Sequence, residues 1–428
     1  MFDILPELQA RGLVYQTTDD QGLGGWLAEG QRTLYIGFDP TADSMHVGHM
    51  MALMNLRRFQ QAGHRPIALV GGATGMIGDP SGKSEERNLL NEDQLRANSD
   101  AMKEQMARFL DFDEGSGAAV LVNNLDWMQQ FNLLTFLRDI GKNFPVNVML
   151  GKESVKNRLG DTESGLSFTE FSYMLLQAYD FVHLHGELDC QLQVGGSDQW
   201  GNITAGIDLG RRMKSVQLYG LTSPLLTKSD GAKMGKTESG AIWLSAERTS
   251  PYKFYQYWIN VPDEDAGKCL RMLTELPLEE IASLDASREE RPHERESQRA
   301  LAEHLTGLVH GSEGLQAATQ ASQILFGAEI DDLDDAQLLD VFADVPSLEK
   351  GRDELSGGTI TLIDVLVDAG LCQSRGEARR TIEQGGAYLN NRRVDDLERV
   401  LAVEDLASPS VIVLRRGKKK YALLQFPA

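Results

Sequence analysis

Cysteine, long apolar runs and positive charge are all scarce in this 428-residue chain. Its three cysteines, Cys190, Cys269 and Cys372, are scattered and odd in number. They therefore predict neither a metal-binding spacing nor a disulfide framework, and they suit a reducing cytoplasm. No apolar run approaches the roughly 20 residues that a membrane-spanning helix needs. The first residues also lack the basic segment and cleavage site of a signal peptide. We therefore expect a cytoplasmic protein with no membrane partner.

The formal net charge of −21 argues at first against a nucleic-acid partner, because phosphate contacts need lysine and arginine. The charge is unevenly distributed, however. Residues 359–428 carry eleven Lys and Arg against nine Asp and Glu, which is +2, so the remainder carries −23. A basic final segment beside an acidic body can be an RNA-binding module or only a solvated face. Charge alone leaves both interpretations open, and no DNA partner is expected.

Length and hydrophobic pattern predict an α/β protein of two or three domains. A strand is predicted from Thr33 to Phe38, a helix from about His46 to Ala62 and a second strand at residues 66–72. Strand, helix and strand within about forty residues form a βαβ unit. We therefore expect a Rossmann-like parallel sheet with a crevice at its carboxyl edge.

Composition also suggests where the chain divides. The expected parts are an α/β domain at 1–225 with a helical insertion at about 125–180, a loop and helical domain at 226–330, an acidic linker at 331–358 and a small α+β domain at 359–428.

Two short motifs far apart in the chain carry most of the chemical signal. His46-Val47-Gly48-His49 opens the predicted helix, so both imidazoles point to one side of a helix end that attracts phosphate. Lys233-Met234-Gly235-Lys236-Thr237 lies in a glycine-flanked loop, whose two ammonium groups can close over a departing pyrophosphate. Lys83 and Arg87 could add a third cationic arm. Taken singly, these motifs could be a capped helix end, a solvated loop and a surface pair.

Further polar residues follow a helical spacing. Tyr173, Gln177 and Asp180 are four and three residues apart, so a helix presents them on one face. Such a stripe is unusual in a core, because each buried polar group needs a partner. A ligand or an internal network could supply those partners. The segment from Gly195 to Asn202 follows another predicted strand and brings polar side chains to the same sheet edge.

The two motifs resemble the signatures of class I aminoacyl-tRNA synthetases, and longer blocks resemble the bacterial tyrosyl-tRNA synthetases. The matching blocks run from Tyr35 to Thr41, Gly71 to Gly75, Ser167 to Tyr173 and Gly195 to Asn202. They occur in the family's order, and the likeness extends from about residue 30 to the final domain. Long blocks in order are far more specific than either motif alone.

The resemblance implies a tyrosine-binding set and an ATP-binding set. Tyr35 and Asp180 would bind the phenol hydroxyl of tyrosine, and Asp39 would lie between amino acid and nucleotide. The residues that would hold the ammonium and carboxylate groups of tyrosine are Asp79, Tyr173, Gln177 and Gln199. The residues that would bind ATP are Gly37, Gly48, Gly196, Asp198 and Lys236, with Gly196 and Asp198 at the ribose. The residues implied in catalysis at the phosphates are Thr41, His46, His49, Lys83, Arg87, Lys233, Lys236 and Thr237.

Two positions depart from the family pattern. Gly235 stands where many class I enzymes have serine, although glycine is common in the tyrosyl branch and both lysines are present. Ile36 occupies a position that is often cysteine, whose thiol can approach the ribose. Because isoleucine cannot form a hydrogen bond, we expect that ribose contact to be absent and ATP binding to be modestly altered.

The last domain resembles the small S4-type RNA-binding module of the bacterial tyrosyl enzymes. Two basic clusters predict contacts with the tRNA backbone. Their members are Arg375, Arg379, Arg380, Arg415, Arg416, Lys418, Lys419 and Lys420.

The sequence therefore predicts an enzyme that joins L-tyrosine to ATP, releases pyrophosphate and transfers tyrosine to the terminal adenosine of tRNA(Tyr). No cysteine or serine stands in a nucleophile context, so positioning and electrostatic stabilisation would carry the chemistry. Magnesium is expected with the pyrophosphate, with no protein metal site. The resemblance also implies a homodimer through the helical insertion around Phe136 to Met149. A tryptophanyl-type enzyme, another adenylyl-transferring enzyme and a non-catalytic RNA-binding relative remain as alternatives.

Overall fold

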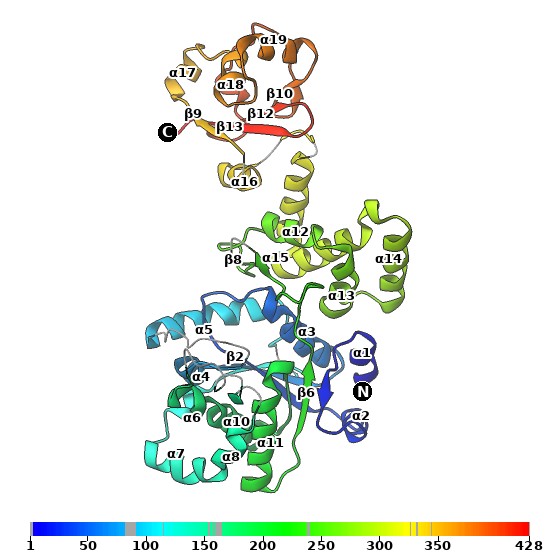
Figure 1. Cartoon of the computed structure of the whole chain (residues 1–428), viewed down its shortest axis with the longest axis vertical. Coiled ribbons are helices and arrows are strands. Elements are labelled where there is room, and N and C mark those ends of the chain that lie inside the picture. Colours follow the sequence, from blue (N-terminus) through cyan, green and yellow to red (C-terminus); the bar gives the residue numbers. More distant parts are fainter. Residues whose placement is uncertain are drawn as a thin grey trace. The chain divides into compact units, whose positions relative to one another are not determined.

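The computed structural model describes residues 3–81, 91–113, 115–152, 155–156, 159, 165–237, 240–325, 327–330, 333–343 and 345–427. These residues form two compact units, which Figure 1 shows coloured along the sequence. The first unit is Met1–Thr249 with Asn260–Val309, and the second unit is Ser250–Ile259 with His310–Ala428.

The first unit is built on a six-stranded sheet with the order β1-β6-β5-β2-β3-β4. The strands are β1 Gln16–Thr17, β2 Thr33–Phe38, β3 Arg65–Val70, β4 Val120–Asn123, β5 Cys190–Gly196 and β6 Tyr219–Ser223. All neighbouring strands are parallel except β1, which pairs with β6 in the antiparallel sense. The predicted βαβ unit is therefore present, with β2 paired directly to β3.

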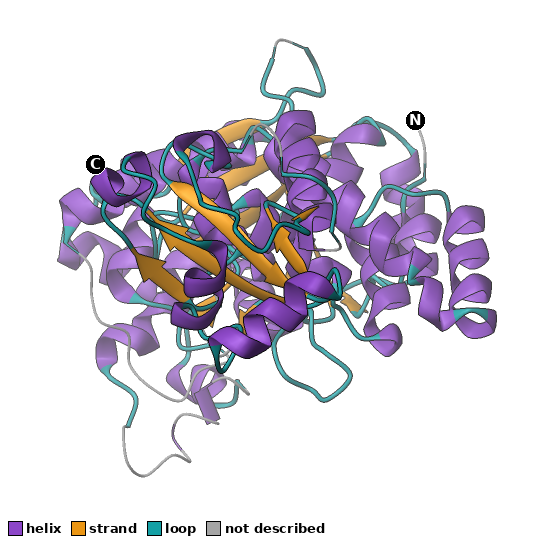
Figure 2. Cartoon of the chain, turned by 90° about the horizontal axis from the view of Figure 1, so that it is seen from above, coloured by secondary structure: helices purple, strands orange, loops and turns teal. Residues whose placement is uncertain are grey.

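Helices cover both faces of this sheet (Figure 2), which explains why β3 is almost entirely apolar and buried. The longer helices are α3 Val47–Gln61, α5 Glu92–Met106, α10 Phe168–Leu188, α11 Trp200–Lys214, α13 Asp263–Leu273 and α14 Leu278–Glu290. The shorter ones are α1 Leu5–Ala10, α2 Gly22–Ala28, α4 Gly72–Ile77, α6 Leu125–Met128, α7 Leu133–Asp139 and α8 Val146–Leu150. In Figure 1, α3 and α5 lie on one side of the sheet, and α10 and α11 lie on the other.

The strand order reverses beside β2. From β2 the chain moves outward to β3 and β4, and then returns to place β5 and β6 on the other side of β2. Connections leave the sheet in opposite directions at this point, so a crevice opens at the carboxyl ends of β2 and β5. Phe38 and Gly196 end these two strands, and each is followed by a polar segment of the predicted site.

The predicted helical domain at 226–330 is wrong, because the structure divides this segment. Residues Asn260–Val309, which include α13 and α14, belong to the first unit, whereas the chain from His310 belongs to the second. The division falls within α15 Glu296–Leu325, where Gly311 has a φ of 74° and a ψ of −179°. Such a backbone conformation is accessible to glycine and interrupts the helix.

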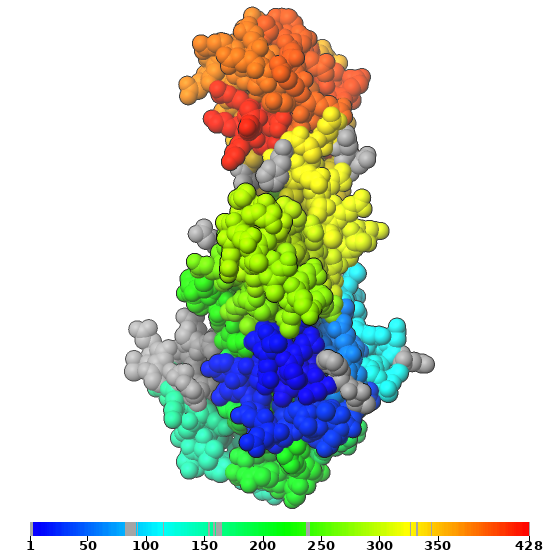
Figure 3. Space-filling model, turned by 90° about the vertical axis from the view of Figure 1, so that its right-hand side faces the viewer, coloured from blue at the N-terminus to red at the C-terminus, as the bar shows by residue number. Residues whose placement is uncertain are grey.

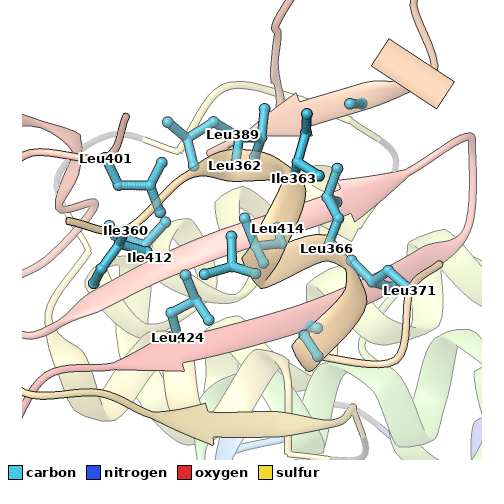
Figure 4. Packing of buried hydrophobic residues seen from close by; sticks show 14 of the residues in the cluster. Ile360, Leu362, Ile363, Leu366, Leu371, Leu389, Leu401, Ile412, Leu414 and Leu424 are labelled. Carbon is cyan, nitrogen blue, oxygen red and sulfur yellow. The ribbon is translucent and has the colours of Figure 1, made fainter. Parts of the chain in front are cut away.

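The second unit contains a five-stranded sheet with the order β11-β10-β12-β13-β9. The strands are β9 Ser347–Glu349, β10 Ala387–Leu389, β11 Arg392–Arg393, β12 Val411–Arg416 and β13 Lys420–Gln425. The helices, besides the end of α15, are α12 Pro251–Ile259, α16 Asp335–Val341, α17 Arg352–Ser356, α18 Leu362–Asp368 and α19 Arg375–Glu383. Figure 4 shows apolar side chains of α18, including Leu362 and Leu366, packed against Leu414 and Leu424 of the two central strands.

The acidic linker predicted at 331–358 is also wrong. The described part of this stretch contains α16, β9 and α17, and β9 adds a parallel strand beside β13. Leu338 and Phe342 are buried against Val413 and Tyr421, on a hydrophobic cluster separate from that of α18. The acidic composition suggested a solvated linker. The apolar residues among the acidic ones are spaced for one face of a helix, however, and that face is buried.

Among the described helices, none combines the length and the apolar character that crossing a membrane requires.

The packing of α16 predicts that Phe342→Ala destabilises the second unit by about 3–5 kcal/mol, because it leaves a cavity in a closed core. Denaturant unfolding of the full chain, with hydrogen exchange read in β12 and β13, measures this change. The matched control is Leu339→Ala on the same helix, where a side chain 37% exposed should change stability by no more than about 0.5 kcal/mol. Equal small effects of both variants would contradict the packing of α16.

Candidate functional site

A single cavity of about 470 Å³ gathers most of the predicted site residues at the crevice between β2 and β5. The predicted residues that line it are Tyr35, Gly37, Asp39, Thr41, His46, Gly48, His49, Asp79, Tyr173, Gln177, Asp180, Gly196, Asp198, Gln199, Lys233 and Lys236. Lys83 and Arg87 lie outside the described residues. Thr237 is described only by its backbone, in the short strand β7 Lys236–Thr237 that pairs with β8 Gly240–Ala241.

Tyr35, on β2, lines the cavity. It is 1% exposed and meets the ring of Phe181 edge to face, with ring centroids 5.3 Å apart. Its hydroxyl has no hydrogen-bond partner among the described residues. Burial, followed by the charges of Asp180 and Cys190, raises its pKa well above the ordinary value, so the phenol stays protonated. A buried hydroxyl without a partner is costly, and a bound ligand could supply the missing hydrogen bond.

Asp180, on α10, is also 1% exposed, and two donors hold its carboxylate. Trp127 Nε1 donates to Oδ1 at 2.9 Å, and Asn124 Nδ2 donates to Oδ2 at 3.0 Å. Burial raises the pKa of Asp180 to about 8, against the opposing effect of these two hydrogen bonds. The carboxyl group therefore changes its protonation near neutral pH, which is characteristic of functional sites.

The same network continues to Asp39 at the end of β2. Asn124 Nδ2 also donates to the hydroxyl of Thr74 at 3.0 Å, and Thr74 Oγ1 donates to Asp39 Oδ1 at 2.7 Å. Tyr173 donates its hydroxyl to Asp39 Oδ2 at 3.0 Å. This close approach requires glycine at position 71, since a Cβ there would lie 2.2 Å from Asp39 Oδ1. A continuous chain of hydrogen bonds thus joins the two predicted carboxylates, Asp39 and Asp180.

A second network holds the amide side chains. Gln199 Nε2 donates to Asp79 Oδ2 at 2.7 Å, while Gln199 Oε1 accepts from Gln177 Nε2 at 3.3 Å and from Asn202 Nδ2 at 3.1 Å. Gln177 Oε1 is buried and has no partner among the described residues. The cavity therefore offers a carboxylate and amide oxygens, which are suitable acceptors for an ammonium group.

The two histidines of the first motif both cap α3 and face the cavity. Gly48 N–H donates to His46 Nδ1 at 3.0 Å, and His46 N–H donates to His49 Nδ1 at 3.1 Å. Because each Nδ1 accepts, each neutral ring carries its proton on Nε2. Burial lowers the pKa of His46, and the nearby Lys236 and Lys233 act in the same direction. The rings stack with centroids 3.9 Å apart, and a Cβ on Gly48 would lie 2.8 Å from the His46 ring.

The two motifs are joined through one short stretch of backbone. Val47 N–H donates to the carbonyl of Ile242 at 2.9 Å, and Ile242 N–H donates to the carbonyl of Gly235 at 2.8 Å. Gly235 has a φ of +81°, and a Cβ there would lie 2.7 Å from the Cβ of Val47. The departure from serine at position 235 therefore has a physical reason in this chain, because the second motif packs directly on the first.

Other positions line the cavity without having been predicted. Ala52 adds apolar surface, and Gln193 is buried with an unpartnered Oε1 among the described residues. Ile36, which the family pattern placed near the ribose, lines the cavity as well. Asn124 and Trp127 were also missed, although they hold Asp180. No sequence signal marked them, because each becomes part of the site only through contacts with strands and helices distant in the chain.

The predicted RNA-binding residues lie in the second unit, and one of them is buried. Arg415 is 7% exposed, with its guanidinium 3.8 Å from the ring centroid of Tyr388. Its position on β12 makes Arg415 buried, which sets it apart from the other basic residues predicted to contact tRNA. Arg416 pairs with Glu377 at 2.6 Å, whereas Lys418, Lys419 and Lys420 are exposed.

Across the described ranges, no group of three or more His, Cys, Asp or Glu side chains could hold a metal ion. The three cysteines are buried, and none of them lines the cavity.

The raised pKa of Asp180 predicts a pH-dependent effect of Asp180→Asn on stability. The folded state binds this proton up to about pH 8, whereas the unfolded state releases it near the ordinary value of 3.8. The wild type therefore loses stability relative to the variant as the pH rises from 5 to 8, by up to roughly 1.4 kcal/mol per pH unit. Thermal unfolding across that range measures the difference. A pH-independent effect of the substitution changes the stability difference equally at every pH, so it does not affect this comparison. If the stabilities of the wild type and the variant ran parallel with pH, the raised pKa of Asp180 would be contradicted. Asp126→Asn, at an exposed position, is the control.

Comparison with known proteins identifies the family of this chain. Residues 28–327 match the model of class I tRNA synthetases (W and Y), and residues 337–424 match that of the tyrosine–tRNA ligase SYY-like C-terminal domain. The chain is 60% identical to the tyrosine–tRNA ligase of Rhodopirellula baltica, over 99% of this chain and 96% of that protein. It is 51% identical to the tyrosine–tRNA ligase of Roseiflexus castenholzii, over 99% of this chain and 100% of that protein.

A solved structure shares the fold as well. A C-terminally truncated mitochondrial tyrosyl-tRNA synthetase from Aspergillus nidulans is similar, with a TM-score of 0.67 and 33% identity. The match covers 76% of this chain and 95% of that one. The sequence identity over the whole length and the two matching models together show that this chain belongs to the tyrosine–tRNA ligases of the class I aminoacyl-tRNA synthetase family.

Proposed function

We propose that this chain carries out the reaction of its family in the cavity at the β2–β5 crevice. In the first step, the carboxylate of L-tyrosine attacks the α-phosphorus of ATP, forming tyrosyl-adenylate and releasing pyrophosphate. In the second, a hydroxyl of the terminal adenosine of tRNA(Tyr) attacks the tyrosyl carbonyl and releases AMP. The proposal rests on one cavity that is lined both by a buried phenol and carboxylate, Tyr35 and Asp180, and by the imidazoles and ammonium groups of the two motifs.

At the tyrosine end, we assign the phenol hydroxyl of the substrate to Tyr35 and Asp180. The unpartnered hydroxyl of Tyr35 and the raised pKa of Asp180 support this role, since both are relieved by a new hydrogen bond. Asp79, Tyr173 and Gln177 would receive the ammonium group, and Gln199 would lie beside the carboxylate. The unpartnered oxygen of Gln177 supports that assignment.

At the nucleotide end, each residue has a role that follows from its charge or its donors. The Nε2–H groups of His46 and His49 would donate to phosphate oxygens near the start of α3, where backbone N–H groups and the helix dipole also favour negative charge. Lys233 and Lys236 would stabilise charge on the departing pyrophosphate. The remaining proposed contacts to ATP are Thr41, Asp39, Gly37, Gly48, Gly196 and Asp198, with Lys83, Arg87 and Thr237 completing the cationic clamp.

Catalysis in this account needs no covalent intermediate with the protein. The substrate carboxylate is the nucleophile, so the chain contributes position and electrostatic stabilisation. Burial raises the pKa of the Cys269 thiol to about 12, and no cysteine lines the cavity. Mg²⁺ would be part of the ATP substrate, where it would offset phosphate charge, and no protein residue is proposed as its ligand.

Tyr35 and Asp180, which we call the floor of the cavity, would also discriminate between substrates. Phenylalanine would leave Tyr35 and Asp180 without the phenol hydroxyl, and a site built to bind a hydroxyl rejects the analogue that lacks it. The tyrosyl enzymes are themselves the standard example of this effect, at about 10⁵-fold without editing.

We further propose that tRNA binds the exposed basic residues of the second unit, namely Arg375, Arg379, Arg380, Lys418, Lys419 and Lys420, with Arg416 held in its pair with Glu377. Arg375 and Arg379 are exposed but form intramolecular pairs with Asp364 and Glu398. The lysines at 418–420 are therefore the residues we expect to contribute most.

We also propose that two copies of the chain associate through the helical insertion. Six apolar side chains on α7 and α8 are more than a third exposed: Leu133, Leu134, Leu137, Val146, Val148 and Leu150. Several large apolar side chains exposed in one short segment are typical of a protein interface. A mass of one chain in solution at micromolar concentration would contradict this proposal.

A cytoplasmic location is proposed as well, in keeping with three buried, unpaired cysteines.

Amino-acid-dependent exchange of pyrophosphate into ATP tests the proposed function directly. We expect exchange with tyrosine and not with tryptophan or phenylalanine at the same concentration. Exchange driven by tryptophan would favour a tryptophanyl-type enzyme, and no exchange with any of the three would favour a non-catalytic RNA-binding protein.

Variants of the floor sharpen that test. Asp180→Ala should cripple tyrosine activation far more than it changes the KM for ATP. Tyr35→Phe should raise the KM for tyrosine by about tenfold, the value of one hydrogen bond, without loss of folding stability. Tyr219→Phe, a buried tyrosine of the same sheet outside the cavity, is the control. Equal changes in the KM values for tyrosine and ATP would contradict the assigned roles.

Replacement of Lys418, Lys419 and Lys420 by glutamine should weaken tRNA binding and leave pyrophosphate exchange unchanged. The slope of log K against log salt should become shallower by about 0.7–0.9 for each lysine that binds a phosphate in the wild type. Lys253→Gln is the matched control, because this exposed lysine of the second unit is already paired with Asp340. If the salt dependence of tRNA binding were unchanged in the triple variant, these three lysines would not bind tRNA phosphates.

A further inference from the structure

The loop that carries the second motif is a hairpin, and one of its arms is bonded to α13. Met234 N–H donates to the carbonyl of Leu226 at 3.0 Å, and Lys228 N–H donates to the carbonyl of Ala232 at 2.8 Å. Between these bonds, Thr227 and Lys233 form an antiparallel bridge. The backbone position of Lys233 therefore depends on the position of Thr227 on the other arm.

Two side chains of α13 hold that other arm. Asp265, which is 2% exposed, accepts a hydrogen bond on Oδ1 from the backbone N–H of Ser229 at 2.8 Å. Lys268 Nζ donates to the carbonyl of Thr227 at 2.9 Å and to its hydroxyl at 3.3 Å. A hydrogen bond accepted by a carboxylate is stronger than one between neutral groups, and its loss would leave a buried charge unpaired, so this contact is expected to hold the loop firmly.

The base of the hairpin also packs on α13. Met234 is buried, and its sulfur lies 3.3 Å from that of Cys269, one residue beyond Lys268. The hairpin therefore meets α13 through two polar contacts on one arm and an apolar contact on the other. By contrast, Gly231 has a φ of +83°, and a Cβ there would meet nothing within 4 Å, so the tip of the hairpin is open.

The other end of α13 is fixed to α3, the helix that begins at the first motif. Arg58 of α3 is buried and donates from Nη2 to the carbonyl of Thr274 at 2.8 Å. Arg57 of α3 pairs with Glu275 at 2.6 Å. Arg11 donates to the carbonyl of Leu276 at 3.0 Å, and Figure 3 shows the N-terminal segment (blue) bordering the helical segment after α13 (yellow-green). Buried arginines at the end of a helix satisfy its last carbonyls and make the attachment rigid.

We infer that α13 is a strut that fixes the cationic hairpin relative to the histidine end of α3, and that Asp265 and Lys268 are positioning residues for tyrosine activation. Neither side chain lines the cavity, so both act through the backbone of Thr227 and Ser229. The inference rests on the proposed function, because it assigns to Lys233 and Lys236 the task of stabilising pyrophosphate. Small displacements of such groups are costly, because electrostatic stabilisation depends on their being held in place before the reaction.

The first experiment compares Asp265→Ala and Lys268→Met with the wild type in tyrosine-dependent pyrophosphate exchange, per active site. Each variant should lower the activation rate about 10-fold to 100-fold and raise the KM for ATP. The dissociation constant for tyrosine alone should stay within about twofold, because the floor of the cavity is untouched. Asp265→Asn should restore the rate to within about threefold of the wild type, since its amide oxygen can still accept from Ser229.

The second experiment needs no activity. Trypsin cleavage after Lys233 and Lys236 should be faster in Asp265→Ala and in Lys268→Met than in the wild type. The hairpin should open more often once one of its contacts with α13 is removed. Arg271→Met is the matched control for both experiments. It lies on α13 and loses a 2.6 Å ion pair to Asp285 of α14, yet it does not touch the hairpin, so rate and cleavage should match the wild type.

The outcomes separate the two hypotheses. A wild type without tyrosine-dependent exchange would overturn the proposed function. A wild type with exchange, together with Asp265→Ala and Lys268→Met variants that match it in activation and in cleavage, would overturn the strut. Equal losses in Arg271→Met, or a parallel loss of tyrosine affinity, would also overturn it, because the effect would then be general destabilisation.

Discussion

The carboxylate of Asp180 lies in the interior of the first unit, between the sheet and α10, where an ionised group is unfavourable. Trp127 and Asn124 each donate one hydrogen bond to it, and these bonds hold the carboxylate without fully offsetting its burial. The hydroxyl of Tyr35 shares the cavity and has no partner among the described residues. A phenol hydroxyl supplies what both groups lack. The substrate preference of the site depends on this partly unsatisfied floor.

The nucleotide end depends on a different constraint, which is the close approach of two segments nearly two hundred residues apart in the chain. Gly235 must be glycine because Val47 occupies the space where its side chain would lie. Ile242 then bonds to both motifs through its backbone. With α13 holding the opposite arm of the hairpin and the end of α3, each motif is positioned by the other and by one common helix. The histidines cap a helix and face the cavity at once, so the two interpretations of that motif do not exclude each other.

The family resemblance implied most of the residues that the fold gathers in one cavity, and these residues occur in blocks that end strands or begin helices. Strand order then places such blocks at one edge of the sheet. Prediction from the sequence failed where packing between distant segments decides which residues are buried or join the site. Nothing local distinguishes Asn124 as the link between Thr74 and Asp180, and the acidic residues around α16 conceal an apolar face buried under the second sheet. The burial of Arg415 was not foreseen for the same reason, since the direction of a side chain on a strand depends on register.

The most direct test of the account is the binding of L-tyrosine and L-phenylalanine to the ligand-free protein, measured by isothermal titration calorimetry without ATP or tRNA. Such a titration examines the floor of the cavity apart from the chemistry and apart from the hairpin. We expect tyrosine to bind and phenylalanine to bind at least roughly 100-fold more weakly, because phenylalanine offers no hydroxyl to Tyr35 and Asp180. Equal affinities for the two amino acids would contradict this expectation.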